Sequence, residues 1–340
     1  MEAVLHAVQT WFAARNQAWT LRSKERERLF RSLPAQTSSV DMLRRECARL
    51  ERGAELHGQR LVRAHSHVTI VRIERNNHPK SPVTIYAREW VYFTQMANSL
   101  VHVHGRALTH EMVWRKTDHH WRLVEDKVCG QEETCGLRQP LVRSAIRPYP
   151  LVPPSRTSVA VMRHGESEFD RLRAVRYADL WWNEANPTYP QYGNDGANFV
   201  SQCLYAGGMR MSVLGSADSG GWWCQFARGK GEGAAHVSSD SVPEPSSEAW
   251  NRPGRLYEHL TYHRGAVPLS SSSDLLIGDL VFYDWTGSGK VQHVAMVTDF
   301  DAAGRPLVNA HSLDCQYRLY TMSDSLAWSD KCRYRFLRIP

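Results

Sequence analysis

The sequence predicts an α+β protein built from two domains. Three observations lead to this prediction. The 340-residue chain opens with two segments of helical periodicity, continues with four segments rich in Val, Ile, Tyr and Trp that are typical of strands, and returns to helices followed by strands in its second half. Because 42% of the residues are hydrophobic and 23% are charged, both halves can bury a core. A chain of this length ordinarily forms about two domains.

The first domain is expected over residues 1–128. Residues 2–18 and 41–64 are the expected helices, and residues 67–75, 83–95, 100–116 and 119–128 are the expected antiparallel strands. Helices followed by a curved antiparallel sheet indicate an α+β domain, and their order resembles cystatin-like or NTF2-like modules in pattern only, without a motif. Such a sheet can cup a small molecule, but it is as often a dimerisation or spacer module. A homodimer through this domain is therefore one expectation, and its role stays open.

Two irregular stretches follow the strands. Residues 129–165 hold five prolines among polar residues and are expected to form a linker between the domains. Residues 215–253 are rich in Gly, Ser and Pro, and we expect a long surface loop that lines a cleft of the second domain.

The second domain is expected over residues 166–340. Residues 169–183 are predicted to form an amphipathic helix, and residues 196–206 a second helix capped by Asn194 or Asp195. Residues 277–285 read as a turn entering a strand. Residues 292–298 and 306–312 are expected to form a hairpin around the turn at residues 301–304.

This layout is that of a papain-like thiol hydrolase. In such enzymes the nucleophile lies at a helix N-terminus, where the helix dipole favours thiolate, and a histidine on a strand is the general base. The segments AVRYADLWWN, NFVSQCLYAGG, GDLVFYDW and HVAMVTDFDAAGRPLVNAHS resemble the putative amidase domain family of Gram-positive bacteria, which is related in fold to the NlpC/P60 and CHAP cell-wall hydrolases. The resemblance covers nearly all of residues 166–340. It implies a helix packed on an antiparallel sheet.

The resemblance also implies roles for residues. The family pattern Asp-Cys-Thr-Asn-Phe-Val-Ser-Gln stands here as DGANFVSQ over residues 195–202, so the catalytic cysteine maps to Gly196. The base maps to His293, and its orienting residue maps to Asn309. The amides around Gly196 and Ala197 would form part of an oxyanion site. The residues expected near the substrate are Asp195, Ala197, Trp285 and His311.

The implied activity is hydrolysis of amide bonds in peptide or peptidoglycan-like substrates, without a metal or organic cofactor. Glycine at position 196 offers no nucleophile, and three explanations stand open: a pseudoenzyme, an engineered or erroneous position, or a different mechanism that uses Asp195 or water. Cys203 lies on the same helix face but roughly 10 Å along the axis, too far to share His293, and is expected to be a core cysteine. The alternative function is a binding or scaffold protein that keeps the cleft.

Other motifs favour weaker alternatives. Arg163-His164-Gly165-Glu166 resembles the signature of histidine phosphatases, which makes that activity a minor alternative. The pairs His65/His67 and His102/His104 could each place two imidazoles on one strand face, but zinc needs further ligands. A solvated strand face is the expected reading.

Composition limits the partners and the compartment. The net charge of +7 would suit an anionic partner, but the basic residues are scattered, so we expect an ordinary basic surface and no nucleic-acid partner. The seven cysteines do not indicate a disulfide framework. Neither a secretory signal nor a transmembrane segment is expected, which predicts a protein that is cytoplasmic at synthesis.

Overall fold

The structure is a computed structural model that describes residues 2–75, 81–97, 100–117, 120–129, 169–212, 220–226 and 245–340. These residues form the predicted α+β architecture and fold into two compact units. Unit 1 comprises Met1–Arg138, Phe300–Val308 and Ser312–Asp330, and unit 2 comprises Gln139–Asp299, Asn309–His311 and Lys331–Pro340. Residues 130–165 of the predicted linker lie outside the described residues, so the linker stays a prediction.

Unit 1 begins with three helices: α1 (Glu2–Thr20), α2 (Ser23–Ser32) and α3 (Thr37–Leu56). Helix α2 was not among the predicted helices. The predicted end of the second long helix at residue 64 is wrong, because α3 ends at Leu56. The chain turns there at Gly58, whose φ of 62° is the left-handed conformation that glycine adopts without strain.

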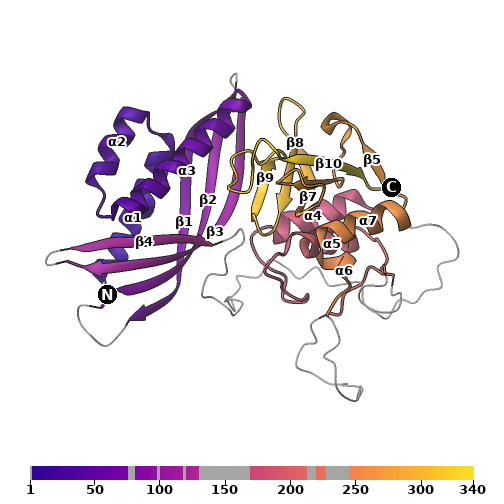
Figure 1. The fold of residues 1–340 in the computed structure, drawn as a ribbon, viewed down its shortest axis with the longest axis horizontal. Coiled ribbons are helices and arrows are strands. Elements are labelled where there is room, and N and C mark those ends of the chain that lie inside the picture. The colour runs from indigo at the N-terminus through magenta and orange to yellow at the C-terminus, as the bar shows by residue number, and fades with distance from the viewer. Residues whose placement is uncertain are drawn as a thin grey trace, which may run out of the picture. The chain divides into compact units, whose positions relative to one another are not determined.

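The sheet of unit 1 is built on three long antiparallel strands: β1 (Arg60–Arg75), β2 (Val83–Ala97) and β3 (Leu100–Lys116). The far edge of β3 pairs with two strands. β4 (Trp121–Cys129) pairs along Thr109–Lys116, and β9 (Cys315–Leu319) pairs at Gly105 and Arg106. Register shifts in β1 and between β3 and β4 mark bulges, which bend strands. Helices α1, α2 and α3 lie on one face of this sheet (Figure 1).

The interior of unit 1 combines an apolar core with a chain of buried charges. Apolar side chains of α1 and α3 pack on the inward residues of β2 and β3, Trp11 and Trp114 among them. Within that core, Arg15 bonds Glu89 at 2.7 Å, and His110 bonds Glu89 at 3.2 Å. These three side chains are almost fully buried. The inner face of the sheet is therefore filled by protein side chains at this point.

Unit 2 packs its helices against antiparallel strands. The helices are α4 (Arg171–Trp181), α5 (Gly196–Ala206), α6 (Glu248–Asn251) and α7 (Pro253–His263), and a 3₁₀ turn spans Ser272–Asp274. The strands are β5 (Val267–Leu269), β6 (Leu280–Asp284), β7 (His293–Phe300) and β10 (Arg333–Arg338), in the order β7-β6-β10-β5. β8 (Pro306–Ala310) neighbours β7, so the predicted hairpin is confirmed.

The core of unit 2 surrounds α5, whose first nine residues are all buried. Part of the stretch predicted as a surface loop also enters this core. Trp222 and Trp250 are fully buried, with ring centroids 4.8 Å apart, and α6 forms within the same stretch. Residues 213–219 and 227–244 lie outside the described residues, so the predicted cleft-lining loop is not addressed there.

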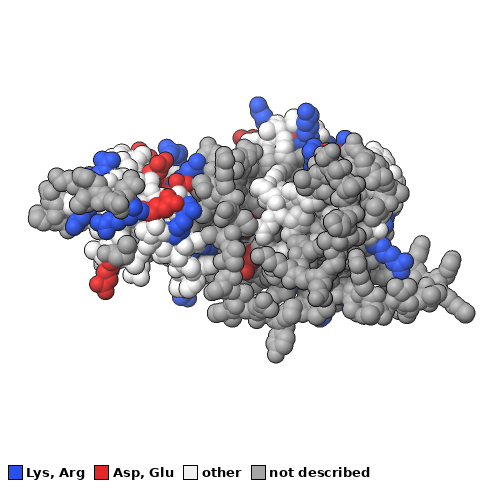
Figure 2. All heavy atoms as spheres, turned by 90° about the horizontal axis from the view of Figure 1, so that it is seen from below, with Lys and Arg blue, Asp and Glu red and all other residues white. Residues whose placement is uncertain are grey.

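On the face that Figure 2 shows, the Lys and Arg side chains at the left of the picture lie among Asp and Glu side chains. The expectation of an ordinary basic surface stays a prediction. None of the helices among the described residues combines the length and the apolar composition needed to cross a membrane.

Candidate functional site

Helix α5 places position 196 at its N-terminal end. Asp195 is the N-cap residue, and its carbonyl oxygen accepts the first helical hydrogen bond from the amide of Phe199 at 2.9 Å. The amides of Gly196, Ala197 and Asn198 precede that bond and have no acceptor within the helix. The Asp195 side chain does not cap them. The helix end therefore offers N–H groups and the positive end of its dipole to a negative charge beside position 196.

His293, the predicted base, faces position 196 from the first residue of β7. Its backbone is fixed by pairing with Tyr283 of β6. A Cβ atom built on Gly196 would lie 3.0 Å from Nδ1 of His293, 3.2 Å from its Cε1 and 3.4 Å from the carbonyl oxygen of Val294. A side chain at position 196 would thus point at the imidazole, which is the pairing that a thiol nucleophile requires. The ring stands close enough that it would have to move by a few tenths of an ångström to admit the Cβ.

The residue before Gly196 is fixed by a histidine. Nδ1 of His311 lies 2.6 Å from a carboxylate oxygen of Asp195, and Nε2 lies 2.6 Å from the carbonyl oxygen of Trp181. A carbonyl oxygen only accepts, so Nε2 carries a hydrogen. The ring also stacks on Phe199 with centroids 4.1 Å apart. His311 therefore ties the start of α5 to helix α4, and its predicted contact with substrate stays a prediction.

Asn198 anchors the same turn from inside the helix. Its side-chain amide donates to Asp195 at 2.8 Å and to the carbonyl oxygen of Pro190 at 3.0 Å. Its side-chain oxygen accepts the indole N–H of Trp250 at 2.7 Å. Both oxygens of Asp195 are thus engaged, one by Asn198 and one by His311, which holds the backbone at Gly196 in place.

The remaining polar residues of the DGANFVSQ motif bind the core. Ser201 donates to the carbonyl oxygen of Trp250 at 2.9 Å and accepts the indole N–H of Trp222 at 3.0 Å. Tyr177 donates to Gln202 at 2.7 Å. These side chains seat α5 against its neighbours, so most of the motif builds the site instead of reacting in it.

Asn309, the predicted orienting residue, lies on β8 and bonds two residues that the sequence analysis missed. Its oxygen accepts the hydroxyl of Thr298 at 2.9 Å, and its amide nitrogen donates to Asp179 at 2.9 Å. The sequence signal that could have identified Asp179 is its carboxylate, which stands next to Ala178 on the apolar face of the predicted helix. The role of Asn309 in orienting His293 stays a prediction.

Trp285 belongs to an aromatic group around His293. Its ring stacks with Tyr283 at 4.6 Å and lies 5.8 Å from the His293 ring, centroid to centroid. Only 7% of Trp285 is exposed. It therefore borders the base, and its contact with substrate stays a prediction.

Cys203 is a core residue, as predicted. It is fully buried within the apolar cluster of unit 2, and burial raises the pKa of its thiol well above the usual value. Burial also raises the pKa of the Cys47 and Cys224 thiols to about 12 and that of Cys315 to about 11. At neutral pH these thiols are protonated, and protonated thiols are poor nucleophiles.

Two weaker alternatives were a histidine phosphatase site and a zinc site at paired histidines. The segment Arg163 to Glu166 lies outside the described residues. His102 and His104 do share a strand face, with ring centroids 5.7 Å apart. Among the residues that the structure describes, however, no group of three or more His, Cys, Asp or Glu side chains is arranged to hold a metal ion.

Comparisons with known proteins point to the C-terminal half of the chain. Residues 168–337, half of the chain, match the model of a family described as "Putative amidase domain". The uncharacterized protein YhbB of Bacillus subtilis (strain 168) is 34% identical over 172 residues, which are 51% of this chain and 50% of YhbB. The chain thus spans about half the length of this relative. No solved structure matches the chain.

Proposed function

Because the chain belongs to the putative amidase domain family, we propose that unit 2 carries the cleft of a thiol-type amide hydrolase from which the nucleophile is missing. The cleft would recognise peptide or peptidoglycan-like amides, and the chain with Gly196 would bind them without turnover by the thiol mechanism. One observation supports this most directly. The Cβ position of residue 196 is 3.0 Å from Nδ1 of His293, at the N-terminus of a buried helix.

The proposed chemistry explains why a thiol at position 196 would act. His293 would take the thiol proton, and the helix dipole would favour the resulting thiolate. The thiolate adds to the amide carbonyl carbon, while the free amides at the start of α5 stabilise the oxyanion. The C–N bond then breaks as His293 returns the proton to the leaving amine. Water, deprotonated by His293, cleaves the thioester and releases the acid and the free thiol.

Glycine removes the atom that forms the first covalent bond and leaves the rest of the arrangement in place. The His311–Asp195–Asn198 contacts still fix the start of α5, and the amides still point out of the helix. Because the site is intact but lacks the reacting atom, we favour binding without turnover. Catalysis by a different nucleophile is the less favoured alternative. The same combination makes a single substitution a meaningful test.

The experiment compares the unmodified chain with its Gly196→Cys variant on simple peptide amides and purified peptidoglycan fragments, with products identified by mass spectrometry. We expect cleavage only by the cysteine variant. Gly196→Ala is the matched control, since it adds the same Cβ without a thiol. Combining Gly196→Cys with His293→Ala should abolish both turnover and rapid alkylation of the new thiol by iodoacetamide at neutral pH.

Two results would contradict the proposal. If the unmodified chain cleaves, another nucleophile or an activated water acts in the cleft. If the new thiol alkylates no faster with His293 than without it, His293 does not pair with position 196. Rapid alkylation without cleavage of any substrate would leave the site correct and would show that the substrate class is wrong.

A further inference from the structure

The hydrogen bonds of His311 determine how many protons its ring carries. The residue follows strand β8 directly, and only 5% of its side chain is exposed. Nδ1 lies 2.6 Å from a carboxylate oxygen of Asp195, the N-cap residue of α5. Nε2 lies 2.6 Å from the carbonyl oxygen of Trp181, the last residue of α4. Both ring nitrogens therefore face an oxygen at hydrogen-bond distance.

These two contacts require two protons. The carbonyl oxygen of Trp181 can only accept, so Nε2 carries one proton. An ionised carboxylate also only accepts, and carboxylic acids are ordinarily ionised at neutral pH. A neutral imidazole with its proton on Nε2 would turn the lone pair of Nδ1 toward a negative oxygen 2.6 Å away, which is repulsive. A second proton therefore lies between His311 and Asp195.

The surroundings of the ring favour a positive charge on His311 over a protonated Asp195. The last carbonyl groups of α4 form the negative end of its helix dipole, which stabilises a cation placed there. The ring also stacks on Phe199, with centroids 4.1 Å apart, and a cation over an aromatic face is attracted to it. Both neighbours stabilise the imidazolium form, so the second proton belongs on Nδ1.

The charge of Asp195 matters because this carboxylate lies at the end of the helix that would hold the nucleophile. Asp195 directly precedes position 196, and its other oxygen accepts the side-chain amide of Asn198 at 2.8 Å. That bond holds the carboxylate against the first turn of α5. An uncompensated carboxylate there would oppose a further negative charge on a thiolate or an oxyanion. An imidazolium 2.6 Å away cancels the carboxylate charge, and the helix dipole can then favour an anion.

We propose that His311 is a positioning residue that acts through Asp195: it is protonated in the folded protein, neutralises the N-cap carboxylate, and so permits a thiolate at position 196. The importance of that thiolate rests on the proposed function, but the charge of His311 does not. This role is separate from the contact with substrate that the sequence predicts for His311.

The first measurement is nitrogen NMR of the histidine rings in the full, unmodified chain. We expect both nitrogens of His311 to be protonated at neutral pH. In Asp195→Asn the new side-chain amide can donate to Nδ1, so His311 should keep its place and show a single protonated nitrogen. A His311 ring with one protonated nitrogen in the unmodified chain would overturn the proposal. This measurement needs no nucleophile and no substrate.

The second measurement is the rate of alkylation by iodoacetamide, across a range of pH, in the Gly196→Cys background. His311→Gln removes the cation and leaves Asp195 charged, so alkylation at neutral pH should slow about tenfold, as for a tenfold smaller fraction of thiolate. Adding Asp195→Asn to His311→Gln removes the carboxylate charge as well and should restore most of the rate. The matched control is His263→Gln, the same change at the exposed end of α7, which should not slow alkylation.

The rescue by Asp195→Asn separates charge from packing. If His311 only packed against its neighbours, the second substitution would remove another contact and lower the rate further. A rate that is not restored in a well-folded double variant, or an unchanged rate in His311→Gln, overturns the proposal. If His311→Gln does not fold, the NMR of the unmodified chain and of Asp195→Asn decides alone. Rescue of alkylation without cleavage of any substrate would support the charge of His311 and contradict the proposed function.

Discussion

At the residue scale, the most unusual interior feature is the chain of buried ionisable side chains in unit 1. His110 bonds Asp126 through Nδ1 at 2.8 Å and Glu89 through Nε2 at 3.2 Å, and Trp11 also donates to Asp126 at 3.0 Å. Burial opposes the charged imidazole, but the two carboxylates outweigh it and raise the pKa of His110 to about 9. The folded protein therefore buries a protonated histidine at neutral pH.

This histidine predicts a loss of stability in mild alkali. The pKa of His110 is about 9 when folded and about 6.5 when unfolded, so its contribution is fully present below about pH 6.5 and is lost as pH rises through 9. That shift corresponds to about 3 kcal/mol of unfolding free energy. Denaturant unfolding at several pH values between 6 and 10 measures it. His110→Gln should be less stable at pH 6 and should lose less stability up to pH 9; parallel curves would contradict the prediction.

Site residues that lie in a short recognisable sequence motif could be predicted from the sequence. Contacts between residues of distant elements could not. The start of α5 and the start of β7 carry their own signals in DGANFVSQ and HVAMVT, and the structure places Gly196 beside His293. Arg15 and Glu89, by contrast, are 74 residues apart, and each belongs to an amphipathic segment without any distinguishing pattern. Their pairing depends on the packing of α1 on the sheet, which periodicity alone does not specify.

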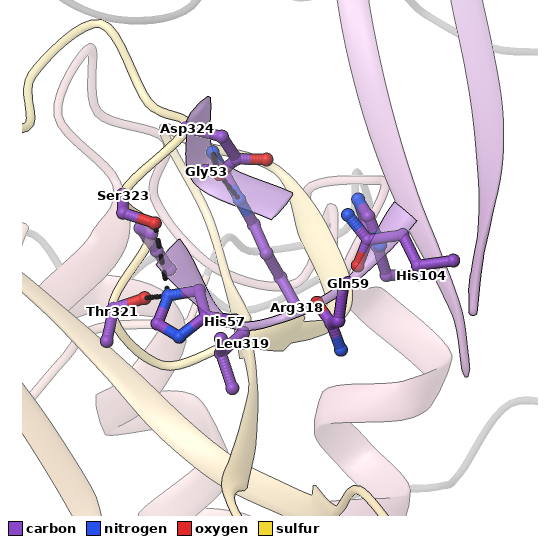
Figure 3. Close-up of a pocket in the computed structure, with 11 residues that line it drawn as sticks. Gly53, His57, Gln59, His104, Arg318, Leu319, Thr321, Ser323 and Asp324 are labelled. Atoms are coloured by element: carbon purple, nitrogen blue, oxygen red, sulfur yellow. Dashed lines mark hydrogen bonds and ion pairs between the residues drawn. The ribbon is translucent and has the colours of Figure 1, made fainter. Parts of the chain in front are cut away.

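At the element scale, helix α3 packs closely against a segment from the end of the chain. A Cβ atom at Gly53 would lie 2.7 Å from the Cβ of Asp324 and 3.3 Å from its backbone. Glycine costs helix stability, so its presence within α3 reflects this close approach. Gly53 and Asp324 also line a pocket of unit 1, together with His57 and His104 (Figure 3).

Gly53→Ala should therefore destabilise the protein although alanine favours helices. We expect a loss of about 1–3 kcal/mol in unfolding free energy, because the neighbouring backbone must shift to admit the methyl group. Gly254→Ala is the matched control in α7, where the nearest atom to the new Cβ is 4.0 Å away. It should be neutral or stabilising by up to about 1 kcal/mol. Equal effects at both positions in denaturant unfolding would show that the contact with Asp324 is not tight.

Elements differed in how well the sequence predicted them. The long strands β2 and β3 and helix α5 match their predicted ranges closely, since each has a sustained period. The shorter α2, α7, β5, β9 and β10 were not predicted. β9 is five residues long and is defined by pairing with β3, so its own residues carry little signal.

At the scale of the whole molecule, unit 1 is completed by residues from the C-terminal part of the chain. Arg88 pairs with Asp314 at 2.6 Å, Arg106 pairs with Asp324, and β9 pairs with β3. The predicted linker at residues 129–165 rests on a change in composition along the chain. Composition does not reveal that a later segment joins an earlier unit.

A fragment of residues 169–340 should accordingly be less ordered than the same residues in the full chain. Residues 312–330 lose their partners in such a fragment, so we expect their amide hydrogens to exchange much faster, and adding residues 1–138 in trans should restore part of the protection. Hydrogen exchange read by mass spectrometry measures both. Residues 196–206 serve as the internal control, since their partners remain. Unchanged protection of residues 312–330 would show that unit 2 orders them alone.

The arrangement of β9 also constrains how the protein is made. Arg106 and Asp324 are 218 residues apart, so the ribosome releases β3 long before the carboxylate and the strand that complete its edge. Until then a nascent chain exposes an open strand edge and a guanidinium without its counter-charge. An open edge is where chains aggregate. A transcript that ends before these residues would therefore yield a product prone to aggregation and degradation, because only a chain translated past Asp324 can complete the edge of β3.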